Sequence, residues 1–173
     1  MAGNGVLVSA LTGKQDEWFK TENPTGACYP LLGRAHIEEM RANGFSFHSH
    51  TRHHKDLTSL AEDALDDQLV GSKQELESIL DCKVRYLAYP YGLTDARVHE
   101  ATRAAGYKCA FSVQPGFNRA SGTDMFHIRR LDVFGTDSAA ALARKVRLGT
   151  NDGSLKAAVS YYASRVAARL GGG

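Results

Sequence analysis

The sequence of 173 residues is poor in the features that mark several classes of protein. Its three cysteines, Cys28, Cys82 and Cys109, are widely spaced and form no Cys-x-x-Cys pair, which argues against a disulfide framework and a zinc knuckle. The 21 basic and 19 acidic side chains leave a net charge of +2, too small to indicate a nucleic-acid partner. No apolar run approaches the roughly 20 residues of a membrane-spanning helix, and no signal peptide is visible. With 43% hydrophobic and 23% charged residues, we expect one soluble globular domain.

Short apolar runs alternate with amphipathic stretches along the chain, which predicts an α/β domain with a largely parallel sheet. The predicted strands are residues 6–10, 45–49, 84–89, 107–113 and 126–134. The predicted helices are residues 31–43, 58–81, 95–105, 137–148 and 154–169. Asp56 or Thr58 is expected to cap the second helix, and Gly44 and Gly106 are expected to end two others. A strand that begins so early indicates a chain that starts within the fold.

Histidine is concentrated in one short segment. Four of the seven histidines, His48, His50, His53 and His54, lie where a predicted strand ends. Imidazole is the commonest protein ligand of first-row metals, and strand ends are where α/β folds gather their sites. His50 and His54 are four residues apart, so one tight turn would let both rings bind one ion. The alternative is a set of solvated loop histidines, or an imidazole that bonds a backbone carbonyl.

Two motifs give this segment a family context. Residues 44–57 resemble the second motif of the polysaccharide deacetylases (NodB-homology enzymes, carbohydrate esterase family four), Gly-x-x-x-x-Ser-His-Thr-x-x-His-x-x-Leu. The positions that match it are Ser49, His50, Thr51, His54 and Leu57. Residues 84–92 resemble the third motif in its Tyr-Pro-Tyr-Gly variant. The resemblance covers most of residues 5–135.

The resemblance implies a distorted, incomplete (β/α) barrel, a TIM-like fold of seven strands with the first one missing. The deacetylase-like domain would span residues 1–150, followed by a C-terminal helix and glycine tail at 151–173. It implies a hydrolase that removes acetyl groups from a polysaccharide or glycolipid sugar, with N-acetyl, a non-peptide carbon–nitrogen bond, favoured over O-acetyl. The implied cofactor is a divalent metal, zinc first and cobalt or nickel second. No compartment is assigned: cytoplasmic is the default, and members of the family often act at the bacterial cell envelope.

The motif positions also imply roles for single residues. His50 and His54 would be the metal's imidazole ligands, which leaves room for water and for an acetyl carbonyl. The backbone N–H of Tyr91 would donate to the oxyanion that develops during hydrolysis. Pro90 and Gly92 would fix that turn and, with Tyr91, contact the acetylated carbohydrate.

The chain departs from the family pattern in three places. It contains no Thr-Phe-Asp-Asp-Gly motif, which carries the catalytic base and the third metal ligand; its adjacent aspartates, Asp66 and Asp67, are interpreted as a solvated helix face. Ala88 stands where many members carry an arginine, and Arg129 or Arg130 could serve instead, with Arg130 the residue we select as catalytic. No Leu-x-His motif with a general acid follows residue 135.

Three interpretations follow. The chain represents a metal-dependent deacetylase without its first strand, a catalytically inactive sugar-binding or scaffolding relative, or a metal-binding hydrolase of another α/β class. The extent of the resemblance disfavours the third. The retained His50 and His54 favour the first, and the missing aspartates favour the second. A barrel without its first strand has an unpaired edge, so we also expect self-association.

Overall fold

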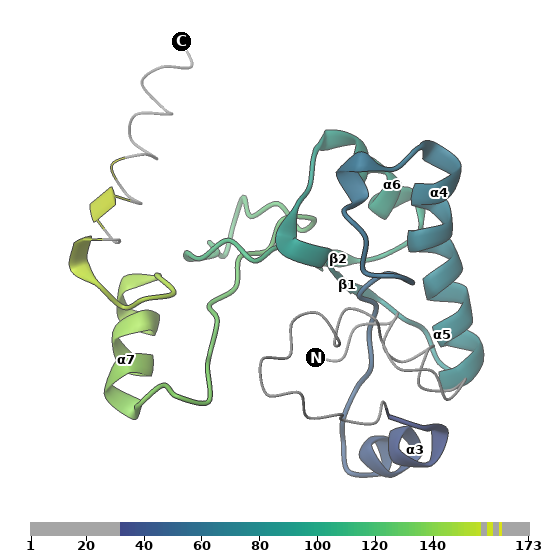
Figure 1. Cartoon of the computed structure of the whole chain (residues 1–173), viewed down its shortest axis with the longest axis horizontal. Helices are drawn as coiled ribbons and strands as arrows, with labels where there is room; N and C mark the ends of the chain where they lie inside the picture. Colours follow the sequence, from purple (N-terminus) through teal and green to yellow (C-terminus); the bar gives the residue numbers. More distant parts are fainter. Residues whose placement is uncertain (1–31, 157–158, 161–162, 164–173) are drawn as a thin grey trace, which may run out of the picture. The chain divides into compact units, whose positions relative to one another are not determined.

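The computed structural model describes residues 32–156, 159–160 and 163, which divide into two compact units (Figure 1). The first unit contains residues 32–111 and 125–127, and the second contains residues 112–124 and the described residues from 128 onward. The predicted strand at residues 6–10 lies outside the described residues, as does part of the predicted helix at 154–169.

The helices of the first unit follow the amphipathic pattern of the sequence. They are α3 (Arg34–Ala42), the 3₁₀ turn η1 (Leu57–Ser59), α4 (Glu62–Asp66), the π-helical η2 (Asp67–Gly71), α5 (Ser72–Leu80) and α6 (Ala96–Ala104). Segments α4, η2 and α5 run on without a break as one long helix (Figure 1). Asp56 caps η1 rather than this long helix, while Asp95 caps α6 by accepting a hydrogen bond from the Val98 amide at 2.8 Å.

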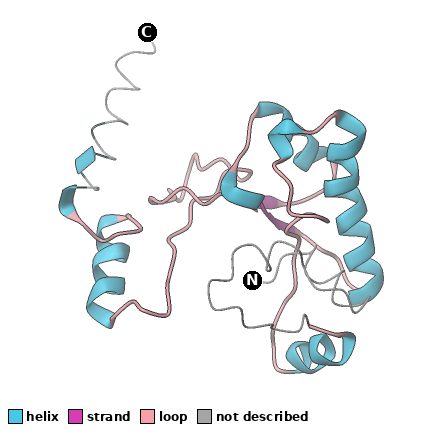
Figure 2. Ribbon diagram, in the orientation of Figure 1, coloured by secondary structure: helices cyan, strands magenta, loops and turns pink. Residues whose placement is uncertain are grey.

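The sheet of the first unit is parallel, as the alternating pattern predicts. Strand β1 (Tyr86–Ala88) pairs with β2 (Cys109–Phe111), and both are drawn in magenta in Figure 2. Leu87 lies opposite Ala110. The predicted strand at 45–49 is reduced to one parallel bridge between Ser49 and Leu87. These are the only named strands in the described part of the chain, so the expected barrel is not established.

The predicted strand at 126–134 does not form in the described structure. Three backbone bonds with β2 and the chain after it take its place. The Ala110 amide donates to the Met125 carbonyl at 2.8 Å, the Ser112 amide to the Ile128 carbonyl at 2.8 Å, and the Arg130 amide to the Gln114 carbonyl at 3.2 Å. The pairing stops at isolated contacts, and no ladder develops along this segment.

The core of the first unit joins one face of the long helix to the sheet and to α6. Leucines 65, 69, 76 and 80 recur at helical spacing along the long helix and are at most 1% exposed. They belong to the same buried cluster as Leu87, Val98 and Ala110. Burying one leucine side chain stabilises a fold by about 1.5–3 kcal/mol. This cluster therefore fixes the helix against the sheet end that carries the histidine loop.

The second unit is built around helix α7 (Ala139–Leu148), which Ser138 caps by accepting a hydrogen bond from the Ala141 amide. Lys145 on α7 is 4% exposed and pairs with the Asp137 carboxylate at 2.7 Å. Its Nζ also donates to the Asp132 carbonyl at 3.2 Å. None of the described helices has the length and apolarity needed to cross a bilayer.

Candidate active site

The histidine segment forms a tight loop between the Ser49 bridge and η1. Two of its residues, Thr51 and His54, have left-handed backbone conformations with φ of 66° and 52°. Side-chain oxygens hold this shape: the Thr51 amide donates to Ser49 Oγ, and the His54 amide donates to Thr51 Oγ1, both at 3.2 Å. Non-glycine residues rarely adopt this conformation, which costs roughly 1–2 kcal/mol per residue. The loop is thus turned back on itself and fixed there.

The turn brings the two predicted ligands together. The ring centroids of His50 and His54 are 4.7 Å apart and the rings meet edge to face. His50 Nδ1 lies 2.6 Å from the carbonyl oxygen of Ala88, at the end of β1. A carbonyl oxygen can only accept, so Nδ1 carries the proton and the neutral ring has its lone pair on Nε2. Metal-binding histidines are commonly oriented in this way.

The Tyr-Pro-Tyr-Gly turn lies against the ring of His54. Tyr91 has φ of 55° within η3 (Pro90–Gly92), and its ring centroid is 4.7 Å from that of His54. The Gly92 amide donates to the Tyr89 carbonyl at 3.1 Å, which closes the turn. His50, His54 and Tyr91, predicted from two separate motifs, therefore meet at one end of the sheet.

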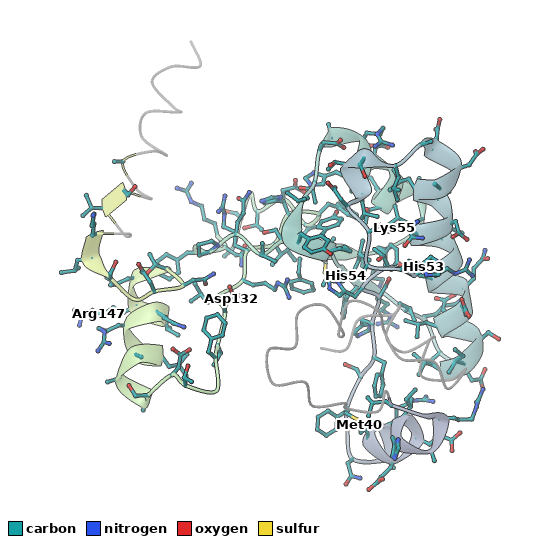
Figure 3. The ribbon with its side chains drawn as sticks, in the orientation of Figure 1. Met40, His53, His54, Lys55, Asp132 and Arg147 are labelled. Carbon is teal, nitrogen blue, oxygen red and sulfur yellow. The ribbon has the colours of Figure 1, made fainter. Side chains whose placement is uncertain are left out.

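The other two histidines of the segment have different surroundings. The ring of His48 lies 4.5 Å from that of Tyr86, and its Nδ1 is buried without a hydrogen-bond partner. Burial lowers the pKa of His48 and the charge of Arg85 lowers it further, so the neutral ring is favoured. His53 is exposed, and its backbone amide donates to Gln68 Oε1 at 2.8 Å. Figure 3 shows His53 and His54 on the loop beside the long helix.

The long helix contributes contacts that the sequence analysis missed. The guanidinium of Arg52 pairs with Asp67 and, at 2.9 Å, with Glu75. Asp67 is exposed, as predicted for a solvated helix face, and its carboxylate also pairs with the histidine loop, a contact that the sequence analysis did not predict. Gly71, an unexplained glycine in the middle of a helix, is the one sequence signal that could have indicated a close approach at this point.

A buried network of hydroxyl groups supports the start of the loop. Ser49 Oγ and Ser72 Oγ lie 3.2 Å apart, and Tyr107 donates its hydroxyl proton to the Leu69 carbonyl at 3.0 Å. Burial raises the pKa of Tyr107, which keeps this phenol protonated and able to donate. The network ties the bridge residue Ser49 to the long helix.

Arg130 belongs to the second unit. Its Nε donates to the Ser112 carbonyl at 2.7 Å, and Arg129 Nη1 donates to the Pro115 carbonyl at 3.0 Å. Both guanidinium groups therefore make backbone contacts inside their own unit. The catalytic role of Arg130 stays a prediction.

Two of the ligands that one divalent metal ion would need are present in the described site. His50 and His54 offer two converging imidazoles, which suit zinc, cobalt or nickel. Among the described residues, no group of three His, Cys, Asp or Glu side chains is close enough to complete a site. The fit is therefore partial.

Comparison with known proteins agrees with the two motifs. The family model described as polysaccharide deacetylase matches residues 11–110. A polysaccharide deacetylase from Bacillus cereus, BC0361, superposes with a TM-score of 0.61 at 29% identity, over 68% of this chain and 37% of its own. The Streptococcus pyogenes deacetylase PplD, in complex with acetate, superposes with a TM-score of 0.61 at 24% identity, over 72% of this chain and 54% of its own.

A curated sequence relative is the "Putative polysaccharide deacetylase YxkH" of Bacillus subtilis (strain 168), 25% identical over 85 residues. That alignment covers 49% of this chain and 30% of the relative. The chain thus spans about a third of the length of YxkH and of BC0361. The family model covers more than half of the chain, including both motif loops, and the chain belongs to the polysaccharide deacetylase family.

Proposed function

We propose that this chain carries the histidine half of a metal-dependent site that removes acetyl groups from a polysaccharide or glycolipid sugar. One observation supports this most strongly. His50 and His54 are brought side by side by a strained loop, and the Ala88 carbonyl fixes the His50 proton on Nδ1. Two imidazoles held side by side, one of them oriented by a backbone carbonyl, are suited to binding a metal ion.

A divalent ion, zinc first and cobalt or nickel second, would supply the chemistry that the side chains lack: it lowers the pKa of a water molecule and polarises a carbonyl group. His50 and His54 would hold it, and the remaining ligand would come from outside the described residues. N-acetyl groups are the favoured substrate. The family's general base is an aspartate of a motif that this sequence does not contain.

The Tyr91 turn would bind the reacting group. Its φ of 55° and the neighbouring Pro90 and Gly92 fix the direction of the Tyr91 amide before substrate arrives. A backbone N–H aimed at the oxygen where negative charge develops contributes about 3 kcal/mol to catalysis in comparable sites. We also propose that Arg130 provides positive charge for the reaction, since Ala88 replaces the family's arginine.

The second candidate is a sugar-binding or scaffolding protein without catalysis. The observation that favours it is the two-ligand donor set: no third metal-binding side chain joins His50 and His54 among the residues described. Such a protein would bind acetylated sugar with or without metal and would release no acetate.

Acetate release separates the two candidates. We expect this chain to release little or no acetate from acetylated chito-oligosaccharides, because loss of a general base costs roughly 10²–10⁴-fold. Joining a Thr-Phe-Asp-Asp-Gly strand ahead of the chain should raise the rate at least roughly a hundredfold, the low end of that range. The gain should disappear on adding a chelator and in His50→Ala.

The control is the same extended protein with Asn-Asn in place of Asp-Asp, which should stay at the rate of the chain alone. Sugar binding with no acetate release from the extended protein would favour the second candidate. Rapid, chelator-sensitive release by the unextended chain would show that another residue acts as base, and His53 would be tested first.

A further inference from the structure

We propose that Arg52 and Gln68 are positioning residues, and that the π-helical turn η2 is a clamp that holds the histidine loop in its metal-binding shape. The inference rests on the proposed function, because it concerns how His50 and His54 are kept in place. It assigns a role to a part of the long helix that carries no predicted ligand.

The contacts between loop and helix fall on consecutive loop residues. Arg52 donates from Nε and Nη2 to Glu75 Oε2, at 3.2 and 2.9 Å, and from Nη1 to Asp67. The next amide, that of His53, donates to Gln68 Oε1 at 2.8 Å. Gln68 is 3% exposed, so its carbonyl oxygen is committed to this bond rather than to water. Arg52 and His53 are thus fixed from the helix side immediately before His54.

The π-helical turn makes this arrangement geometrically feasible. Asp67 and Glu75 are eight residues apart, which on a uniform α-helix places them about 80° apart around the axis. A π turn takes more residues per revolution and reduces that separation, so both carboxylates can face one guanidinium. Single π turns inside α-helices are frequently found at functional sites.

Gly71 provides the space for the clamp. A Cβ atom at this position would lie 3.0 Å from Asp67 Oδ1 and 3.3 Å from Arg52 Cζ. Its backbone is ordinary right-handed helix, with φ of −58°, so glycine is not needed there for conformational reasons. Glycine lowers helix stability relative to other residues at such a position. What it provides instead is room for the guanidinium against the helix backbone.

The test compares zinc affinity with folding stability in the full chain. Gln68→Met removes the acceptor with little change of shape, Arg52→Met removes the ion pairs, and Gly71→Leu fills the space of the guanidinium. Each should weaken zinc binding by about tenfold, the lower end of what supporting contacts around a metal site contribute. Gln68→Glu keeps an acceptor oxygen and should bind zinc within threefold of the parent.

Gly71→Leu separates positioning from stability. Because leucine is the better helix former, this variant should unfold at the same or a higher urea concentration than the parent, yet bind zinc more weakly. Gln74→Met is the matched control, since Gln74 is an exposed residue of the same helix; it should change neither quantity. Zinc affinities equal to the parent in all three clamp variants, or affinities that simply follow the unfolding midpoint, would overturn the proposal.

Amide hydrogen exchange, measured on the metal-free protein, tests the clamp independently of the proposed metal site. If the parent binds no zinc, the metal site is wrong, and the clamp is judged by amide hydrogen exchange alone. In Gln68→Met the His53 amide should then exchange at least fivefold faster, while the core amide of Leu87 keeps its rate. An unchanged His53 exchange rate would overturn the clamp.

Discussion

Backbone strain is concentrated at the candidate site. Of the four non-glycine residues with positive φ in the described part of the chain, Thr51, His54 and Tyr91 belong to the two motif loops, and Asp81 ends a helix. Each such residue costs roughly 1–2 kcal/mol. Strain of this kind persists only where the surroundings impose it, and it commonly marks functional sites. The ring contact between His54 and Tyr91 is one consequence of it.

A prediction at this scale concerns His48 and pH. The pKa of His48 is lowered in the folded protein, so the unfolded chain binds a proton at this residue more readily than the folded protein does. The free energy of unfolding therefore decreases as pH falls below the unfolded value of 6.5. Urea unfolding measured between pH 7.5 and 5 should therefore show a smaller loss of stability in His48→Gln than in the parent. His53→Gln, at an exposed position, is the control and should follow the parent. Equal slopes in all three proteins would contradict the assignment.

Helices were predicted from the sequence to within a few residues at most ends. Gly44, with φ of 86°, and Gly106, with φ of 79°, occupy the end positions expected of them, because left-handed glycines are local signals. The long helix begins at Glu62 instead of residue 58, since Leu57–Ser59 form their own 3₁₀ turn.

Strands and the inner contacts of the site were predicted less well. Whether Phe45 begins a strand depends on partners elsewhere in the chain; here Phe45 is 58% exposed and only Ser49 pairs. The motif spacing indicated that His50 and His54 meet. The contacts of Asp67 and Gln68 with the histidine loop could not be predicted from the sequence. Gly71 indicates a close approach to the helix, but the π turn has no sequence signature of the kind that marks helix ends.

At the scale of elements, Glu77 links helix α5 to the chain that enters β1. Its carboxylate accepts from Lys73 Nζ at 3.0 Å and from the Val84 amide at 2.9 Å, which ties the helix to the chain entering β1. Burial acts to raise the pKa of Glu77, but these bonds and the charges of Lys73 and Lys83 outweigh it and hold the pKa below 4.5. Its contribution to stability is therefore present above pH 4.5 and is lost as pH falls through the lowered value.

Replacing Glu77 should expose this dependence. Glu77→Gln should lower the free energy of unfolding at pH 7 by about 1 kcal/mol and reduce the loss of stability between pH 5 and 3. Asp66→Asn removes one carboxylate at an exposed position of the same long helix and should change little. Thermal unfolding at several pH values measures both effects, and a Glu77→Gln protein as stable as the parent at pH 7 would contradict the account.

At the scale of the whole molecule, the residues of the candidate site are divided between the two units. The residues that meet, His50, His54 and Tyr91, all lie in the first unit, and the family match ends within it at residue 110. Arg130 lies in the second unit, so its proposed role depends on how the complete site is assembled. The chain spans about a third of the length of relatives such as BC0361, so the deacetylase activity is proposed for this chain.

Self-association is the prediction at this scale. In the described residues the sheet has two three-residue strands and one bridge, too few to close a barrel, and open sheet edges tend to pair with other chains. Light scattering should give an average mass above the 18.8 kDa of one chain, rising with concentration. A single species of monomer mass with cooperative unfolding would contradict this.

The central claim, that His50 and His54 bind one divalent metal ion, is tested most directly by zinc titration of the metal-free protein. The account predicts one zinc per chain, with binding lost in the His50→Ala, His54→Ala double variant and retained in His53→Ala and His36→Ala. Zinc bound equally well by the double variant and the parent, or loss of binding in His53→Ala alone, would contradict it.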